Sequence, residues 1–214
     1  MEKTKERNYK KYIKFGIVIV LIAIFITLWI AVENGNIHGF DEKIYDAISS
    51  VKSPMLTNIL VIITEIGGFF GLLFILLVTV IILLYKGRKK ETLGIMLNLA
   101  ISTYVYIFLK QVFQRTRPIT GDILIDETGF SFPSGHSTNN MAFYGFAIYL
   151  VCLNVKNHRL RNFLCVILAL IPIVIGISRI YLRVHYPSDV IAGFSLGIVL
   201  VILFISFIYP RIKL

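Results

Sequence analysis

The sequence predicts an all-α, polytopic membrane protein in which six helices cross the bilayer. Of its 214 residues 57% are hydrophobic, and the mean hydropathy is +0.79, which is too apolar for an ordinary soluble domain of this length. The apolar residues gather in six stretches, each close to the roughly 20 residues that cross a hydrocarbon core of about 30 Å. Helices are expected because a backbone in lipid must satisfy its own hydrogen bonds, and no stretch alternates as a barrel strand does. The six stretches are Phe15–Val32, Phe69–Tyr85, Thr92–Leu109, Thr138–Leu153, Phe163–Ile180 and Val190–Tyr209.

The segments that precede the first two stretches indicate what kind of helix each stretch belongs to. A basic run before Phe15–Val32 suggests a cleaved signal peptide, but the stretch is long for such a peptide and no A-x-A-like site follows it. We therefore expect a retained helix. Ahead of the second stretch, residues 55–66 include Glu65 near their end and are followed by the pair Gly67-Gly68. Glu65 is expected at the outer membrane surface, so this segment is predicted to be an interfacial helix that leads into the second span.

The other four stretches begin or end at polar residues of the outer face. Lys110 ends the third span, and His136 opens the fourth. Arg179 ends the fifth span, and Asp189 opens the sixth just after Pro187. All four polar ends are thus expected on the same side of the membrane.

The charge distribution sets the orientation. The net charge is +10, which could suggest a nucleic-acid partner, but 15 of the 22 basic residues lie in the segments of one side. By the positive-inside rule that side is cytoplasmic, with both termini inside and the four polar ends outside. No nucleic-acid partner is expected. The fifteen residues are Lys3, Lys5, Arg7, Lys10, Lys11, Lys14, Lys86, Arg88, Lys89, Lys90, Lys156, Arg159, Arg161, Arg211 and Lys213.

A single membrane-embedded domain is expected over residues 1–214, with residues 1–14 as a basic cytoplasmic tail, because no repeat or low-complexity tract divides the chain. The tail either attracts anionic lipids, at about 1 kcal/mol per basic residue, or only determines topology. Cys152 and Cys165 are near the cytoplasmic ends of two spans, where a structural disulfide is not expected.

Three short blocks carry the chemistry: KQVFQRTRP at 110–118, PSGH at 133–136 and SRIYLRVHYPSD at 178–189. Their cations suit a phosphoryl group, whose transfer is catalysed mainly by positioning and by stabilising charge on its oxygens. Their two histidines can supply a nucleophile and a proton donor. A single outer cation is commonly a snorkelling interfacial residue, but a set that opposes the orientation bias indicates an anion site.

The second and third blocks place these groups at helix starts. His136 follows Ser134 and Gly135 where a loop becomes a helix, and such an N-terminus offers free N–H groups to an anion. Ser134 alone would be an ordinary helix cap. Asp189 lies four residues after His185, so its carboxylate can fix the imidazole tautomer, can cap the sixth helix, or can do both.

The order and spacing resemble the type 2 phosphatidic acid phosphatase family of lipid phosphatases. That family carries a lysine, six residues and Arg-Pro; then Pro-Ser-Gly-His; then Ser-Arg, five residues, His, three residues and Asp. The resemblance extends over residues 60–205, and every motif position is present. The matching positions are Lys110, Arg117 and Pro118; Pro133 to His136; and Ser178, Arg179, His185 and Asp189.

The resemblance implies hydrolysis through a phosphohistidine, without a metal or another cofactor. His185 would attack phosphorus, Asp189 would orient it, and His136 would protonate the leaving oxygen. The groups that would hold the phosphoryl oxygens are Lys110, Arg117, Ser134, the Gly135 backbone N–H and Arg179.

Several polar residues lie outside these motifs. Arg115 and Arg183 are either plain interfacial cations or part of the site, and His38 and His158 are expected to be loop histidines. With two cysteines in apolar segments, no zinc site is expected. Three acids of the outer loop could bind a cation or form a lid, but a solvated loop is favoured: Asp122, Asp126 and Glu127.

A site at the end of a membrane bundle favours a substrate whose phosphate lies at the surface while its tail stays in lipid. Recycling of a polyprenyl diphosphate, such as undecaprenyl diphosphate, on the outer face of a bacterial cell membrane fits best. Phosphatidylglycerophosphate or phosphatidate hydrolysis and lipid phosphotransfer are the alternatives. The same blocks occur in soluble vanadium haloperoxidases, against which the spans argue. A lipid-binding or flipping protein without chemistry is disfavoured by the complete histidine pair.

Overall fold

The computed structural model describes residues 2–118 and 127–212, and every helix or strand assigned in these residues is a helix. This confirms the all-α class. The helix α1 begins at Glu2, so residues 2–14 of the basic segment are helical and continue directly into the first apolar stretch. The elements are α1 (Glu2–Glu33), α2 (His38–Ser49), α3 (Pro54–Ile66), α4 (Phe69–Tyr85), α5 (Lys89–Phe113), α6 (Gly135–Asn154), α7 (His158–Tyr181), α8 (Pro187–Leu203), a π-helical turn (Phe204–Ile208) and a 3-10 turn (Tyr209–Arg211).

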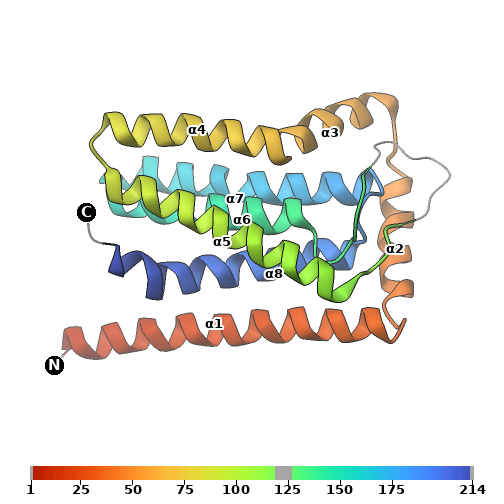
Figure 1. Ribbon diagram of the computed structural model, residues 1–214, viewed down its shortest axis with the longest axis horizontal. Coiled ribbons are helices and arrows are strands. Elements are labelled where there is room, and N and C mark those ends of the chain that lie inside the picture. The colour runs from red at the N-terminus through yellow and green to blue at the C-terminus, as the bar shows by residue number, and fades with distance from the viewer. Residues whose placement is uncertain (1, 119–126, 213–214) are drawn as a thin grey trace.

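The helices form an elongated bundle with one capped end (Figure 1). The helices α1, α4, α5, α6, α7 and α8 run along the long axis, whereas α2 lies across one end. The C-terminal end of α5, the start of α6 and the α7–α8 turn are at this end, and both chain termini are at the other. The three sequence blocks therefore meet at one end of the bundle, beside α2.

Four helical segments of the described chain are long and apolar enough to cross a membrane: Tyr12–Glu33, Lys89–Phe113, His158–Tyr181 and Pro187–Arg211. The helices α3 and α4 meet at a bend of 53° and count as a fifth span if they are taken together. Six spans were expected, and the one missing from these five is α6. Its first turns carry a polar run that lowers its hydropathy. That run is Ser137, Thr138, Asn139 and Asn140.

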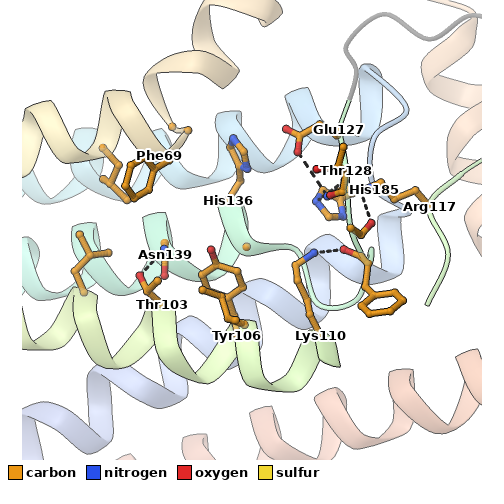
Figure 2. Close-up of a pocket in the computed structure, with 18 of the residues that line it drawn as sticks. Phe69, Thr103, Tyr106, Lys110, Arg117, Glu127, Thr128, His136, Asn139 and His185 are labelled. Carbon is orange, nitrogen blue, oxygen red and sulfur yellow. Dashed lines mark hydrogen bonds and ion pairs between the residues drawn. The ribbon is translucent and has the colours of Figure 1, made fainter. Parts of the chain in front are cut away.

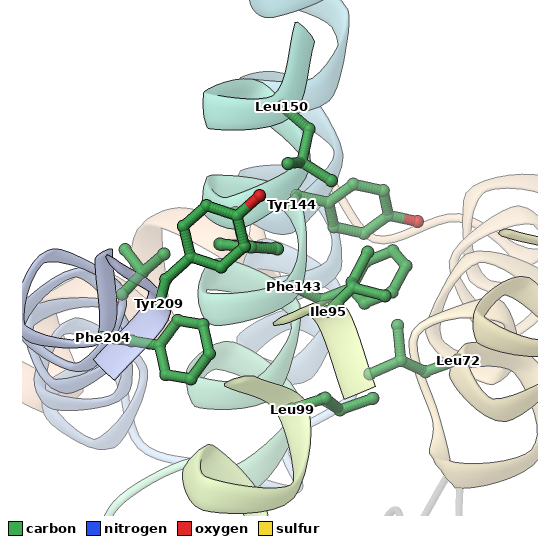
Figure 3. Packing of buried hydrophobic residues seen from close by; sticks show 10 residues of the cluster. Leu72, Ile95, Leu99, Phe143, Tyr144, Leu150, Phe204 and Tyr209 are labelled. Carbon is green, nitrogen blue, oxygen red and sulfur yellow. The ribbon is translucent and has the colours of Figure 1, made fainter. Parts of the chain in front are cut away.

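The polar start of α6 is accommodated because α6 is the central helix of the bundle, packed against α5, α7 and α8. Ser137, Thr138 and Asn140 are completely buried. Asn140 donates to the carbonyl of Gly67 at 2.8 Å, which ties the α3–α4 bend to α6. Farther along, α6 contributes to an apolar core shown in Figure 3, whose buried members are Leu72, Ile95, Leu99, Phe143, Tyr144, Phe146, Leu150, Val201, Phe204 and Tyr209.

Two glycines let α8 approach α6 closely. A Cβ on Gly193 would lie 2.7 Å from the carbonyl oxygen of Ser134, and one on Gly197 would lie 2.7 Å from that of Thr138. Small residues four apart are a common device for close packing of membrane helices. Because Ser134 precedes His136 and Gly193 follows Asp189, this contact also sets the distance between two of the sequence blocks.

We expect Gly193→Ala to lower both stability and activity. The added methyl group meets backbone at Ser134, which cannot rotate away, so the helices must separate; overpacking of this kind costs about 1–3 kcal/mol. Thermal unfolding of the purified protein in detergent measures the loss. The matched control is Gly16→Ala in α1, where a Cβ meets nothing within 4 Å. Equal melting temperatures for the two variants would contradict the close-packing argument.

Candidate active site

A cavity of about 380 Å³ opens where the blocks meet, between the α3–α4 bend, α5, the start of α6 and the segment after Glu127. Figure 2 shows that its two ends differ in chemistry. Charged and imidazole groups surround the end near α2, and apolar side chains of α4 and α5 line the other end. Such a cavity suits an amphiphile. The polar lining includes Lys110, Arg117, Glu127, His136 and His185, and the apolar lining includes Phe69, Leu72, Leu73, Leu99 and Ile107.

His185 lies in the turn between α7 and α8, and its side chain is buried although its edge borders the cavity. Its Nδ1 is 3.4 Å from Oδ2 of Asp189. The Ser131 hydroxyl lies 3.3 Å from the same Nδ1 and donates to Asp189 Oδ2. The opposite ring nitrogen, Nε2, is 3.4 Å from Nη1 of Arg117. The carboxylate therefore faces one nitrogen of the ring, and the Arg117 guanidinium faces the other.

The protonation of His185 follows from this setting. Burial lowers the pKa of His185 well below its ordinary value, and the charges of Lys110, Arg179 and Arg117 lower it further. The ring is therefore neutral at pH 7. With Nδ1 directed to a carboxylate, the neutral tautomer that carries its proton on Nδ1 leaves a lone pair on Nε2, as in the histidine of a serine-protease triad.

His136 is in the first turn of α6 and borders the same cavity (Figure 2). It lies beside the α3–α4 bend, since a Cβ on Gly68 would be in van der Waals contact with its Nε2, at 3.4 Å. Gly135 also borders the cavity, and a Cβ there would lie 2.7 Å from the ring of Tyr106. Only glycine fits this position without displacing that ring.

Ser134 is the N-cap of α6, which was the alternative considered for it from the sequence. Its Oγ accepts from the backbone N–H of Ser137 at 3.4 Å and from the Ser137 hydroxyl at 3.0 Å. It is completely buried and does not border the cavity. A contact between this hydroxyl and a phosphoryl oxygen therefore stays a prediction.

The three motif cations converge on the segment that follows the outer loop. Lys110 donates to the carbonyls of Phe130 and, at 3.3 Å, Ser131. Arg117 donates to the carbonyls of Gly129 at 3.0 Å and Thr128 at 3.1 Å, and to that of Val184 at 2.8 Å. These contacts hold two positive charges at the polar end of the cavity.

Arg179 is the third cation and the most deeply placed, with 1% of its surface exposed. Its Nη1 donates to Thr64 Oγ1 at 2.8 Å, and its Nη2 pairs with Glu127. Its Nε has no hydrogen-bond partner among the residues that the structure describes. This guanidinium therefore retains an unused donor.

Glu127 differs from the solvated loop residue expected from the sequence. Its carboxylate bridges two guanidinium groups, pairing with Arg179 through Oε1 and lying 3.5 Å from Arg117 Nη2 through Oε2. An anionic ligand would meet the same two groups. Asp122 and Asp126, the other acids of this loop, lie outside the described residues.

Because Glu127 neutralises both guanidinium groups, we expect Glu127→Gln to tighten binding of a phosphate analogue. The side chain is 27% exposed, so solvent screens the pair and the gain should be modest, with about a three- to tenfold lower Ki for vanadate. Inhibition measured at constant ionic strength tests this. The control is Glu42→Gln, an exposed site on α2 at the same end of the bundle. An unchanged or higher Ki in Glu127→Gln alone would show that the carboxylate does not compete with anions.

The structure adds residues that the sequence did not assign to the site. Ser131 lies between His185 and Asp189, and Asp41 of α2 joins Asp189 through Arg115. The position of Ser131 just before the PSGH block could have indicated that it belongs to the site. No feature of the sequence around Asp41 indicates such a role. Arg183, the other cation left open, donates to Ser49 Oγ at 2.9 Å and lies over the ring of Tyr45, away from the cavity.

This fold and site define a helical membrane protein with a cavity lined by cations beside a buried histidine–aspartate pair. The sequence pattern of the PAP2 superfamily matches residues 91–213, and the chain belongs to that superfamily, as its three blocks predicted. It is thus a member of a lipid phosphatase family.

Named relatives and a solved structure agree with this assignment. The chain is 30% identical to phosphatidylglycerophosphatase B of Bacillus subtilis over 84% of its own length and 89% of the relative's. It is 23% identical to an undecaprenyl-diphosphatase of Sulfolobus acidocaldarius over 84% of both chains. The crystal structure of a transmembrane PAP2-type phosphatidylglycerolphosphate phosphatase from Bacillus subtilis superposes with a TM-score of 0.83 at 29% identity, covering 92% of this chain and 98% of that one.

Proposed function

We propose that this protein removes a phosphate from a membrane lipid through a phosphohistidine intermediate. The observation that carries the proposal is the cavity with two chemically different ends. At one end a neutral, buried His185 meets three cations, and at the other the apolar side chains of α4 and α5 can receive the start of a lipid chain. A phosphate monoester or diphosphate on a long apolar tail has the matching shape.

In the first half-reaction, Nε2 of His185 attacks phosphorus while the bond from phosphorus to the leaving oxygen breaks. The ring becomes cationic on attack, and Asp189 stabilises it through Nδ1–H. His136 donates a proton to the leaving oxygen. The charge on the phosphoryl oxygens is met by the groups predicted from the motifs: Lys110, Arg117, Arg179, the Gly135 backbone N–H and Ser134.

In the second half-reaction, water attacks the phosphohistidine and inorganic phosphate leaves. His136, left neutral by the first step, accepts the water proton, so the enzyme returns to its starting state. We propose that no metal takes part, because the cations supply the charge that a metal would supply. Within residues 2–118 and 127–212, no group of three or more His, Cys, Asp or Glu side chains could hold a metal ion.

For the substrate, we propose a polyprenyl diphosphate such as undecaprenyl diphosphate, whose phosphate lies at the membrane surface. The undecaprenyl-diphosphatase relative supports this class. Phosphatidylglycerophosphate is a second candidate, which is favoured by the higher identity and the TM-score of the Bacillus subtilis comparisons. A phosphotransferase would share the first half-reaction and differ only in the acceptor, with a lipid or sugar hydroxyl in place of water.

The deciding experiment measures kcat/KM for phosphate release by the purified protein in detergent micelles. The panel contains undecaprenyl diphosphate, phosphatidylglycerophosphate, phosphatidate and lysophosphatidate. We expect the highest value for undecaprenyl diphosphate. If kcat/KM is highest for phosphatidylglycerophosphate, the second candidate is the substrate. If phosphate is released from none of the four lipids, the proposal that the protein is a phosphatase is wrong. Transfer to an added alcohol in place of phosphate release would identify a phosphotransferase.

We also propose six spans, with the site on the outer face of the cell membrane. The helices α4 and α6 run along the same axis as the four spans defined by length and hydropathy (Figure 1). The neighbours α5, α7 and α8 pack around α6. Lys89 at the start of α5 and the basic residues of the α4–α5 connection, Lys86 and Arg88, are at the end opposite to α2. The positive-inside rule then places α2 and the cavity outside.

Cysteine labelling of intact cells tests this orientation. In a background in which Cys152 and Cys165 are replaced by serine, Lys43→Cys on α2 should react with a membrane-impermeant maleimide. Lys89→Cys should react only after the cells are opened. Both positions are exposed, so access to the reagent depends on the side of the membrane. The reverse labelling pattern would put the site in the cytoplasm.

A further inference from the structure

We propose that Arg115 and Asp41 are positioning residues for the reaction: Asp41 of α2 holds Arg115, and Arg115 holds the Asp189 carboxylate against His185. This inference rests on the proposed function, in which Asp189 orients the nucleophile. None of the motif positions includes Arg115 or Asp41, and neither side chain borders the cavity.

Arg115 is held by four side chains. Its Nη1 donates to Asp189 Oδ1 at 2.6 Å and to the Ser188 hydroxyl at 2.8 Å, and its Nη2 donates to Asp41 Oδ2 at 2.9 Å. The guanidinium lies over the ring of Tyr186, 3.9 Å from the ring centroid. The side chains of Arg115, Asp41 and Asp189 are only 8%, 1% and 0% exposed, so solvent screens this ion-pair chain little. A planar guanidinium held in this way has no freedom to follow a moving carboxylate.

The contact determines which way the Asp189 carboxylate faces. Oδ2 accepts from the Ser131 hydroxyl and, at 2.9 Å, from the backbone N–H of Tyr186, and it faces His185 Nδ1 at 3.4 Å. Oδ1 is the atom that Arg115 holds. With both oxygens engaged, the carboxylate cannot rotate about its Cβ–Cγ bond. Without Arg115, Oδ1 loses its ion pair, and the plane that presents Oδ2 to the imidazole is no longer fixed.

Asp41 acts on the site only through this guanidinium and the start of α8. Its Oδ1 accepts from the backbone N–H of Ser188 at 2.9 Å, and its Oδ2 accepts from the Ser188 hydroxyl at 2.8 Å as well as from Arg115. The hydrogen bonds of Asp41 go to Arg115 and Ser188, and none goes to His185 or Asp189. The arrangement places one guanidinium between two buried carboxylates, so loss of either carboxylate changes how firmly Arg115 is held.

A purely structural link between α2 and α8 would use the same contacts, and the two roles differ in what they change. A structural link would alter stability and every property of the cavity together. A positioning role alters the reactivity of His185 and leaves anion binding intact, because the cations that meet the anion are Lys110, Arg117 and Arg179. Misplacement of a reacting group by about 1 Å can cost about 10²-fold in rate.

The experiment compares Arg115→Ala, Arg115→Lys, Asp41→Asn and the double variant Asp41→Asn/Arg115→Ala, on the best substrate of the wild type. We expect kcat to fall about 10²-fold in Arg115→Ala and about tenfold in Arg115→Lys and Asp41→Asn. The Ki of inorganic phosphate, which the cations bind without a bond to His185, should change less than about twofold in the folded single variants. Millimolar guanidinium should raise kcat of Arg115→Ala at least about fivefold, but not that of His185→Ala. Asp41→Asn keeps an acceptor for the Ser188 backbone N–H and removes the carboxylate oxygen that Arg115 and the Ser188 hydroxyl share.

The double variant separates a relay from two independent contacts. If Asp41 acts through Arg115, adding Asp41→Asn to Arg115→Ala causes no further loss of kcat. Multiplicative losses, an absence of guanidinium rescue, or a Ki of inorganic phosphate that rises in step with the loss of kcat would overturn the inference. The proposed function fails separately: it is overturned if the wild type releases no phosphate, whereas this inference is overturned if an active, His185-dependent enzyme is indifferent to Arg115.

Discussion

Replacing His185 by alanine should lower kcat/KM below about 10⁻⁴ of the wild-type value on every substrate, because the variant has no nucleophile to form the covalent intermediate. His185 is the imidazole that meets both the Asp189 carboxylate and the cations, and its lowered pKa keeps Nε2 available at neutral pH. Rate measurements in detergent, together with phosphate labelling of the protein, test this. The wild type should carry an acid-labile, base-stable label that is absent from His185→Ala.

The control for this experiment is His158→Ala. His158 is exposed at the start of α7, at the end of the bundle opposite to the cavity, where it contacts Arg161. Its loss should leave kcat/KM and labelling unchanged. If His185→Ala retains more than about one hundredth of the wild-type rate while it stays folded, direct attack by water would replace the phosphohistidine mechanism.

The main features of the fold could be predicted because apolar composition is a local property. The second predicted stretch, Phe69–Tyr85, has the same bounds as α4, and residues 55–66 differ from α3 by one residue at the start. The helix α2 was not predicted. Its role comes from Asp41 and Tyr45, whose partners at Ser188 and His185 are 147 and 140 residues away in the sequence. No local pattern records contacts of that range.

The same limit applies to the site. The blocks indicated the histidines and cations because their order and spacing follow a known pattern, and the helix packing brings those residues to one end of the bundle. The contacts that hold them are long-range. Nothing near Glu127 indicates that its carboxylate bridges Arg117 and Arg179, and nothing near Arg115 distinguishes a buried double ion pair from an interfacial cation. Such pairs appear only once the folded positions of distant carboxylates are known.

Replacing Arg179 by lysine should lower kcat/KM about 10²–10³-fold although the positive charge is retained, as is typical when a preorganised donor to a developing charge is lost. Arg179 uses Nη1 for Thr64 and Nη2 for Glu127, and it keeps an unpaired Nε in the described part of the chain. A lysine ammonium is a point charge that cannot reproduce this planar fork of donors, so it cannot both keep the contact to Thr64 and meet a phosphoryl oxygen.

The companion variant is Arg183→Lys, one turn along the chain, where the guanidinium contacts Ser49 and the Tyr45 ring outside the cavity. The same change of side chain should there cost less than about threefold. For Arg179→Lys we also expect a higher vanadate Ki, because the phosphate analogue uses the same donors as the transition state. A loss below about tenfold in Arg179→Lys would mean that charge alone suffices at this position and that the geometry of the fork does not contribute to catalysis.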